Sequence, residues 1–139
     1  MFLLDTNVVS ELRRRERADP AVVAWADTVA VSQSYLSAIT LLELELGILR
    51  MERRDTRRGA SLRAWLDGQI LPRFDGRILA IDTPVALACA RLHVPDPRSE
   101  RDALIAATAL VHGMIVVTRN VNDFTPTGAR VLNPWLNSG

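Results

Sequence analysis

Short runs of apolar residues alternate along the chain with longer segments in which apolar residues recur every three or four positions. A short continuous apolar run is typical of a buried strand, and the longer spacing is typical of an amphipathic helix. The pattern predicts strands at residues 1–4, 31–37, 77–81, 114–118 and 130–132. It predicts helices at residues 7–15, 20–29, 40–53, 56–71, 83–92 and 99–112.

Apolar strands that alternate with helices indicate a parallel sheet covered by helices on both faces. We therefore expect an α/β fold, a three-layer α/β/α sandwich around a central, mostly parallel sheet. The length of 139 residues suits one domain, residues 1–139, with a core that needs no disulfide. No internal repeat or linker interrupts the pattern.

Capping signals predict where several of these helices begin and end. Thr40 and Glu43 match a capping box, which would place Glu43 in the first turn of its helix. Pro72 is expected to end the helix before it, because proline lacks the N–H that a helix interior needs. Gly113 is expected to end the helix over residues 99–112.

Composition narrows the possible functions more than net charge does. The net charge is +1, so the overall field of the protein says little about its partners. Every basic residue is arginine, which excludes a lysine nucleophile or Schiff base. The single cysteine, Cys89, cannot form an internal disulfide, which predicts a reducing cytoplasm. We expect neither a secretory signal nor a membrane-spanning segment.

Four carboxylates fall at or near the edge of the sheet where ligands gather in such folds. Asp5 follows the first strand, and Glu43 begins the helix after the second. Asp102 lies in the first turn of a helix, and Asp123 lies in the loop after the strand over residues 114–118. Each alone could cap a helix or close a turn. Together they would repel one another, so the cluster predicts a bound cation.

Carboxylate oxygens favour Mg²⁺ or Mn²⁺ as that cation. Zinc would need imidazole or thiolate ligands, and His93, His112 and Cys89 lack metal-ligand spacing. A hard cation makes bound water more acidic and stabilises charge on a phosphate, which favours phosphodiester hydrolysis. A phosphatase with an aspartyl nucleophile fits less well, because residue 7 is Asn7 and lysine is absent.

Four segments resemble the acidic motifs of the PIN-domain family. They are Leu3–Asn7, Thr40–Leu44, Asp102–Ala109 and Thr118–Phe124. The segments follow one another in family order and span nearly the whole chain, so the resemblance is specific. It is nearest to the VapC and FitB toxins of bacterial toxin–antitoxin pairs.

The resemblance implies a ribonuclease that cleaves single-stranded RNA with Mg²⁺ or Mn²⁺. It implies inhibition by a VapB-like antitoxin, and homodimers that can pair further with the antitoxin. Asp5 and Asp102 would be direct metal ligands, and Glu43 and Asp123 would complete the site directly or through water. The polar positions that would orient the acids or water are Thr6, Thr118 and Asn120.

Arginines near the ends of predicted helices have two interpretations. They could grip the RNA backbone, or they could complement the negative end of a helix dipole. The candidate RNA contacts are Arg13, Arg14, Arg15 and Arg119.

Two alternatives to the RNA-cleaving toxin stay open at this point. One is a structure-specific or DNA-directed nuclease of the same family, since both chemistries use the same acidic metal site. The other is a catalytically silent module that binds the antitoxin without turnover. Substrate competition would separate the first alternative, and antitoxin binding without cleavage would indicate the second.

Overall fold

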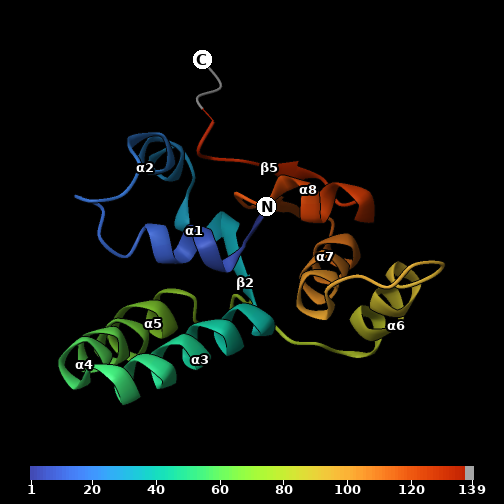
Figure 1. The fold of residues 1–139 in the computed structure, drawn as a ribbon. Coiled ribbons are helices and arrows are strands. Elements are labelled where there is room, and N and C mark those ends of the chain that lie inside the picture. The colour runs from blue at the N-terminus through green and yellow to red at the C-terminus, as the bar shows by residue number, and fades with distance from the viewer. Residues whose placement is uncertain (137–139) are drawn as a thin grey trace.

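Five parallel strands form the centre of the molecule in the computed structural model, which describes residues 1–136 (Figure 1). They are β1 (Phe2–Leu4), β2 (Ser34–Ser37), β3 (Ile78–Leu79), β4 (Ile115–Val117) and β5 (Val131–Leu132). The strand order is β3-β2-β1-β4-β5, and each neighbouring pair is parallel. The predicted α/β class with a parallel sheet is confirmed. Residues 137–139 of the predicted 1–139 domain lie outside the described residues.

Helices flank the sheet on both sides, with α3, α4 and α5 together on one side and α6 and α7 on the other (Figure 1). The helices are α1 (Thr6–Glu11), α2 (Pro20–Asp27), α3 (Ala38–Arg54), α4 (Thr56–Trp65), α5 (Leu71–Arg73), α6 (Thr83–Leu92), α7 (Glu100–His112) and α8 (Val121–Phe124). Shorter helical turns are η1 (Val31–Gln33), η2 (Leu66–Ile70, a π-helical turn) and η3 (Thr125–Thr127). Within residues 1–136, no helix has the length and apolar character needed to cross a membrane.

Neighbouring residues of the central strand β1 belong to different core clusters. Leu3 packs in a cluster with Ile105 of α7, whereas Leu4 packs in a cluster with Val8 of α1 and Ile48 of α3. Consecutive side chains of a strand point to opposite faces of the sheet. The two clusters are therefore the two sides of one sheet, and the predicted three-layer sandwich is confirmed.

The helix that carries Glu43 begins earlier than predicted. Ser37 is the N-cap of α3, and its Oγ accepts a hydrogen bond from the N–H of Ile39 at 3.0 Å. The predicted capping box of Thr40 and Glu43 is therefore wrong. Thr40 is fully buried inside the helix, and Glu43 lies beyond its first turn. The reason is local: β2 ends at Ser37, which is itself a good cap residue, so the helix follows the strand directly.

The predicted helix over residues 7–15 stops at Glu11. Only Val8 and Val9 are buried in α1, and the arginine-rich residues that follow have no apolar face to pack. An amphipathic helix draws most of its stability from such packing, so the helix ends where the apolar face ends. The candidate RNA contacts at residues 13–15 therefore lie in an irregular segment after α1.

Pro72 does not end its helix, contrary to the prediction. The regular helix α4 passes into the π-helical turn η2 after Trp65 and continues as α5 to Arg73. Pro72 is the second residue of α5 and follows the π-helical turn η2, and the helix ends one residue later at Arg73. By contrast, Gly113 ends α7 as predicted, in a left-handed conformation with φ of 66°.

Two further segments differ from the predicted pattern. The predicted strand over residues 31–37 begins only at Ser34, because residues 31–33 form η1. Asp123 was expected in a loop and lies instead in the short helix α8. Both differences involve single helical turns, which are too short to show a helical period in the sequence.

Candidate active site

Asp5 occupies the junction between β1 and α1, at the carboxyl end of the sheet. Its backbone N–H donates a hydrogen bond to the carbonyl oxygen of Val117 on β4, at 2.9 Å. Its Oδ1 accepts a hydrogen bond from the N–H of Thr6 at 2.8 Å, so Asp5 is also the N-cap of α1. The residue is 6% exposed. Strand and helix together therefore fix this carboxylate from both sides.

The second oxygen of the Asp5 carboxylate is held by Thr118, which follows β4. The Thr118 hydroxyl donates to Oδ2 of Asp5 at 2.8 Å, and Nδ2 of Asn7 donates to the same oxygen at 3.3 Å. The Thr118 hydroxyl also accepts from the backbone N–H of Asn120 at 3.0 Å and from Asn7 at 3.3 Å. Oδ1 of Asn7 accepts the N–H of Arg119 at 3.3 Å, which ties this loop to α1.

Glu43 reaches the same edge of the sheet from α3. The hydroxyl of Thr6 donates a hydrogen bond to its Oε1 at 2.9 Å. The guanidinium of Arg101, at the start of α7, lies 3.9 Å from its Oε2. Glu43 therefore lies between α1 and α7, and its carboxylate is oriented by both.

Asp102 lies in the first turn of α7 and is partly buried. Burial raises the pKa of its carboxyl, and the negative charges of Asp5, Asp123 and Glu43 raise that pKa further. A hydrogen bond with Ser99 offsets part of this rise. The charges of Asp5, Asp123 and Glu43 therefore all act on the carboxyl of Asp102. We call Asp5, Glu43, Asp102 and Asp123 the acid cluster.

Ionisation of the buried Asp5 carboxyl is disfavoured in the same way as that of Asp102. Burial raises its pKa, whereas the hydrogen bonds from Thr118 and the backbone of Thr6 lower it, and the charge of Asp123 raises it again. A raised pKa means that the ionised form is disfavoured relative to water. An ion of opposite charge in the acid cluster would remove that cost.

The donor atoms of the acid cluster suit a hard divalent cation, because they are all carboxylate oxygens. Within residues 1–136, no three His, Cys, Asp or Glu side chains form a group that could hold a metal ion as they stand. Asp123 is exposed on α8 and Glu43 is only partly buried, so two of the four carboxylates have space to reorient. The residues fit such a cation by chemistry and charge.

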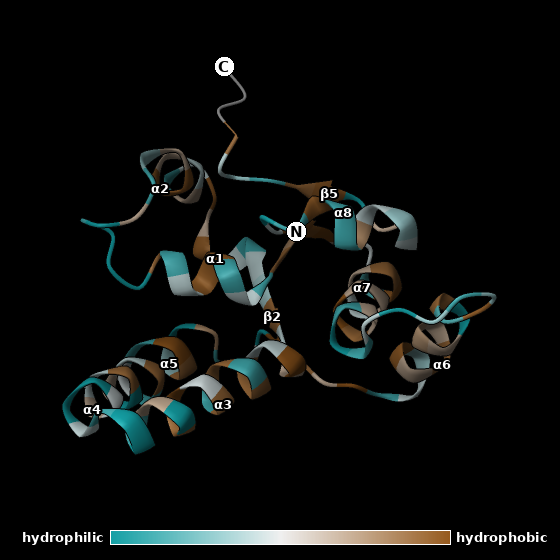
Figure 2. Ribbon diagram, viewed as in Figure 1, coloured by the Kyte–Doolittle hydropathy of each residue, from teal (hydrophilic) through white to brown (hydrophobic). Residues whose placement is uncertain are grey.

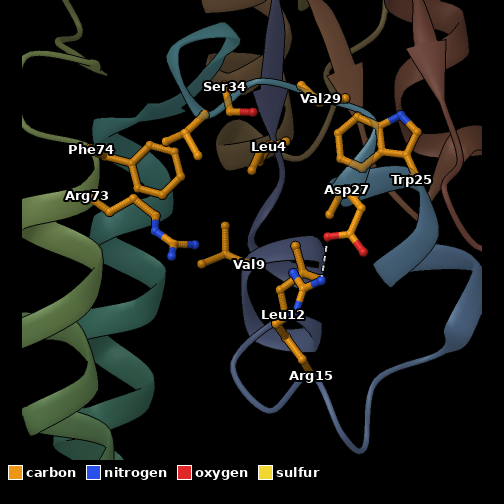
Figure 3. Close-up of a pocket in the computed structure, with 12 residues that line it drawn as sticks. Leu4, Val9, Leu12, Arg15, Trp25, Asp27, Val29, Ser34, Arg73 and Phe74 are labelled. Atoms are coloured by element: carbon orange, nitrogen blue, oxygen red, sulfur yellow. Dashed lines mark hydrogen bonds and ion pairs between the residues drawn. The ribbon is translucent and has the colours of Figure 1, made fainter.

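The predicted RNA-contacting arginines occupy three different environments. Arg15 forms an ion pair of 2.5 Å with Asp27, and both line a pocket of about 320 Å³ between α1, α2 and α5 (Figure 3). The guanidinium of Arg119 lies over the ring of Trp135, 5.2 Å from its centre. Arg13 and Arg14 line a different pocket. The four arginines therefore do not form one surface.

Three residues with contacts to the acid cluster were not predicted as site residues. Asn7 donates a hydrogen bond to Asp5, Arg101 faces Glu43, and Ser99 lowers the pKa of Asp102. Asn7 belongs to the first acidic motif, and Ser99 is the N-cap residue of α7, so both carried a sequence signal. Arg101 carried none, because its contact depends on how α3 and α7 pack.

Comparison with known proteins gives the same family throughout. A family model described as PIN domain matches residues 2–125. The chain is 39% identical to the VapC ribonuclease Y4jK of Sinorhizobium fredii, over 97% of this chain and 98% of that relative. It is also 39% identical to the toxin FitB of Neisseria gonorrhoeae, over 97% of this chain and 99% of FitB.

Solved structures agree with these relatives. The FitAcB structure from Neisseria gonorrhoeae matches with a TM-score of 0.89 and 39% identity, over 97% of this chain and 99% of that chain. The DNA-bound VapBC structure from Salmonella typhimurium matches with a TM-score of 0.75 and 25% identity, over 97% and 98%. The chain belongs to the PIN-domain family, in the branch of the VapC and FitB toxins. The resemblance stated from the four acidic motifs is confirmed.

Proposed function

We propose that this chain is the toxin of a toxin–antitoxin pair and cleaves single-stranded RNA at the acid cluster with Mg²⁺ or Mn²⁺. One observation carries the proposal: Thr6 donates its backbone N–H to Oδ1 of Asp5 at 2.8 Å and its hydroxyl to Oε1 of Glu43 at 2.9 Å, which holds two of the four carboxylates at the same edge of the sheet. The charges of Asp5, Asp123 and Glu43 also raise the pKa of Asp102. Proteins rarely keep such a repulsive group without a function or a counter-ion. The relatives named as VapC ribonuclease and FitB toxin support the same function.

The side chains of the acid cluster would have different roles. Asp5 and Asp102 would bind the metal ion directly, and Glu43 and Asp123 would complete the site directly or through water. When bound, Mg²⁺ or Mn²⁺ supplies a more acidic water and stabilises negative charge on a phosphate. Thr6 orients Glu43 through its 2.9 Å hydrogen bond.

The loop after β4 has a supporting role in the proposed site. The Thr118 hydroxyl directs one oxygen of Asp5 through a 2.8 Å hydrogen bond. Asn120 contributes its backbone N–H to the Thr118 hydroxyl at 3.0 Å. Together they leave Asp5 a single orientation, which keeps the metal ligand in place when the ion is absent.

We further propose that a VapB-like antitoxin binds and inhibits this chain, and that the chain forms homodimers. The matching structures include a toxin–antitoxin complex from Klebsiella pneumoniae, at 25% identity and a TM-score of 0.66. The FitB relative matches over 97% of this chain at 39% identity, and the matching solved structures include FitAcB and FitAB bound to a DNA fragment. An inhibitory partner is consistent with an enzyme that degrades the RNA of its own cell.

The decisive experiment compares wild type with Asp5→Asn and Asp102→Asn on a single-stranded RNA and on DNA of the same sequence. Wild type should cleave the RNA, chelator should stop cleavage, and Mn²⁺ should restore it. Each variant should stay folded and lose about 100-fold or more in rate, because a metal ligand is lost. Asp67→Asn is the matched control, since Asp67 is an exposed carboxylate in η2.

Three results would contradict the proposal in different ways. Variants that cleave as fast as wild type would show that the acid cluster does not take part in catalysis. Undiminished cleavage in excess chelator would show that catalysis needs no metal ion. Faster cleavage of DNA than of RNA would favour the DNA-directed alternative, and tight antitoxin binding without any cleavage would favour the silent module.

A further inference from the structure

Five arginines line one pocket of about 690 Å³ between the segment after α1 and the start of α4. They are Arg13, Arg14, Arg17, Arg57 and Arg58, and we call this site the arginine pocket. The remaining lining residues are Met51, Ser61 and Leu62. Figure 2 shows that both segments, after α1 and at the turn from α3 into α4, are mostly hydrophilic.

The arginine pocket concentrates positive charge without an internal counter-ion. Among residues 1–136, none of its five guanidiniums forms an ion pair within 4.0 Å of a carboxylate. Burial lowers the pKa of Arg13, and the positive charges of Arg14, Arg58 and Arg17 lower it further, with Glu16 acting in the opposite direction.

Helices α3 and α4, which we call the α3–α4 hairpin, also carry an arginine that does pair with carboxylates. Arg63 on α4 lies 2.5 Å from Glu45 and 3.3 Å from Glu52, both on α3. Carboxylate partners are therefore available on the hairpin, yet they neutralise Arg63 and leave the arginine pocket uncompensated. Mutual repulsion of this kind is relieved when an anion binds.

Two helices connect the arginine pocket to the acid cluster. Thr6, the first residue of α1, donates a hydrogen bond to Glu43 of the acid cluster, which lies in the N-terminal half of α3. Arg13 follows the far end of α1, and Met51 lies eight residues after Glu43 on α3. At 1.5 Å per residue, this places the pocket about 12 Å from Glu43 along the helix. An extended strand of a few nucleotides spans that distance.

We propose that the arginine pocket binds backbone phosphates of a single-stranded RNA whose neighbouring segment lies at the acid cluster. This inference rests on the proposed function, because it assigns a second contact for the same substrate. Guanidinium groups bind phosphate oxygens in pairs, which suits a cluster of arginines to a polyphosphate backbone. An acidic peptide is the alternative occupant, and RNA is favoured because the pocket lies about 12 Å along α3 from Glu43 of the acid cluster, where the proposed substrate is cleaved.

The test measures RNA binding without cleavage, by fluorescence anisotropy in chelator and in an Asp102→Asn background. The probe is a short single-stranded oligoribonucleotide. The variant Arg57→Gln/Arg58→Gln removes two charges from the pocket, at exposed positions in the first turn of α4. The matched control Arg53→Gln/Arg54→Gln removes two exposed charges from the last turn of α3, outside the pocket lining.

The pocket variant should bind about tenfold more weakly at low salt, and its salt slope should fall by about 0.7 for each lost phosphate contact. The control should stay within about twofold of the parent at about 0.15 M salt, where charges more than about 8 Å from the RNA are largely screened. Circular dichroism of each variant checks that the fold is intact.

Equal weakening by both double variants would overturn the proposal, because it would indicate a diffuse field rather than a site. An unchanged salt slope in the pocket variant would also overturn it. The proposal would also be overturned if an acidic peptide such as polyglutamate bound at the pocket while the pocket substitutions left RNA affinity unaffected. Pocket-dependent RNA binding by a chain that never cleaves RNA would support the arginine pocket and contradict the proposed function, so the two failures are distinguishable.

Discussion

The hydroxyl of Thr6 donates a hydrogen bond to Oε1 of Glu43 at 2.9 Å, across 37 positions of the sequence. This bond joins the first turn of α1 to the middle of α3. Glu43 is not held by its own helix, because α3 begins at Ala38 and the residue lies beyond the first turn. The orientation of the Glu43 carboxylate therefore depends on a neighbouring helix.

Replacing Thr6 with Val removes this hydroxyl at nearly constant volume. We expect the free energy of unfolding of Thr6→Val to fall by about 1 kcal/mol, the usual contribution of one hydrogen bond. RNA cleavage should fall by about tenfold, as is typical when a residue that orients a metal ligand is lost. Urea denaturation and single-turnover cleavage measure the two effects. Thr6→Ser keeps the hydroxyl and should keep both values; equal losses in Ser and Val variants would contradict the orienting role.

Replacing Asn7 with Asp should destabilise the metal-free protein. Nδ2 of Asn7 donates to Oδ2 of Asp5 at 3.3 Å, and a carboxylate there would offer only another negative oxygen. We expect Asn7→Asp to lower the free energy of unfolding in chelator by about 2 kcal/mol. Mn²⁺ should restore part of the loss. Gln33→Glu adds the same charge at an exposed position of η1 and should leave stability within about 0.5 kcal/mol of wild type.

The raised pKa of Asp102 predicts how stability changes with pH in chelator. The carboxyl ionises near 3.8 in the unfolded chain and at a higher pH in the folded chain, so the folded state binds the proton more tightly. Stability from this residue is full below the unfolded pKa and is lost as pH rises through the folded pKa. Asp102→Asn should therefore have a higher Tm than wild type at neutral pH, and the difference should shrink toward about pH 4. A neutral-pH Tm below that of wild type would contradict this electrostatic cost.

With Mn²⁺ present, wild type should have a higher Tm than Asp102→Asn, which is the reverse of the order expected in chelator. A ligand that binds only the folded state at 100 times its Kd adds about 2.7 kcal/mol to the free energy of unfolding. Wild type should gain such a Tm increase with Mn²⁺, and Asp102→Asn should gain much less because a ligand is missing. Differential scanning calorimetry with and without Mn²⁺ measures both. The same Tm increase in both proteins would place the bound ion outside the acid cluster.

Two glycines of the α3–α4 region should respond oppositely to alanine. A Cβ on Gly59 would lie 2.6 Å from the Cα of Glu52, so α3 and α4 approach closely only because residue 59 has no side chain. Gly59→Ala should lower the free energy of unfolding by about 2 kcal/mol. Gly68 has nothing within 4 Å, and Gly68→Ala should raise stability by about 0.5 kcal/mol through its helix propensity. Thermal denaturation of the two variants compares them, and a stable Gly59→Ala would show that the hairpin can open.

The sequence predicts the strands of this protein better than its helix ends. The predicted strand over residues 114–118 is Ile115–Val117 in the structure, because a short apolar run rich in β-branched residues after a helix-ending glycine is typical of a central strand. The start of α3 was predicted wrongly, since Ser37 and Thr40 are both good caps and the local pattern cannot choose between them. The choice is made by the sheet, where Ser37 is the last residue of β2 and pairs with β3.

The candidate site also contains some residues that the sequence predicts and others that it does not. Asp5 was predictable because a residue directly after a buried parallel strand must emerge at the carboxyl edge of the sheet. The partners of the acids were less predictable, because they depend on how separate elements pack. Arg101 faces Glu43 only because α7 and α3 meet across the end of the sheet. Nothing in the residues that flank Arg101 specifies that contact.

The acid cluster draws on both layers of the sandwich: Glu43 comes from α3 on one face of the sheet and Asp102 from α7 on the other. Asp123 follows β4, and its position is reached only after most of the chain has been synthesised. A growing chain therefore cannot bring the four carboxylates together before residue 123 has been added. On the proposed function, a nascent chain that ends before Asp123 is expected to be inactive toward the RNA that encodes it.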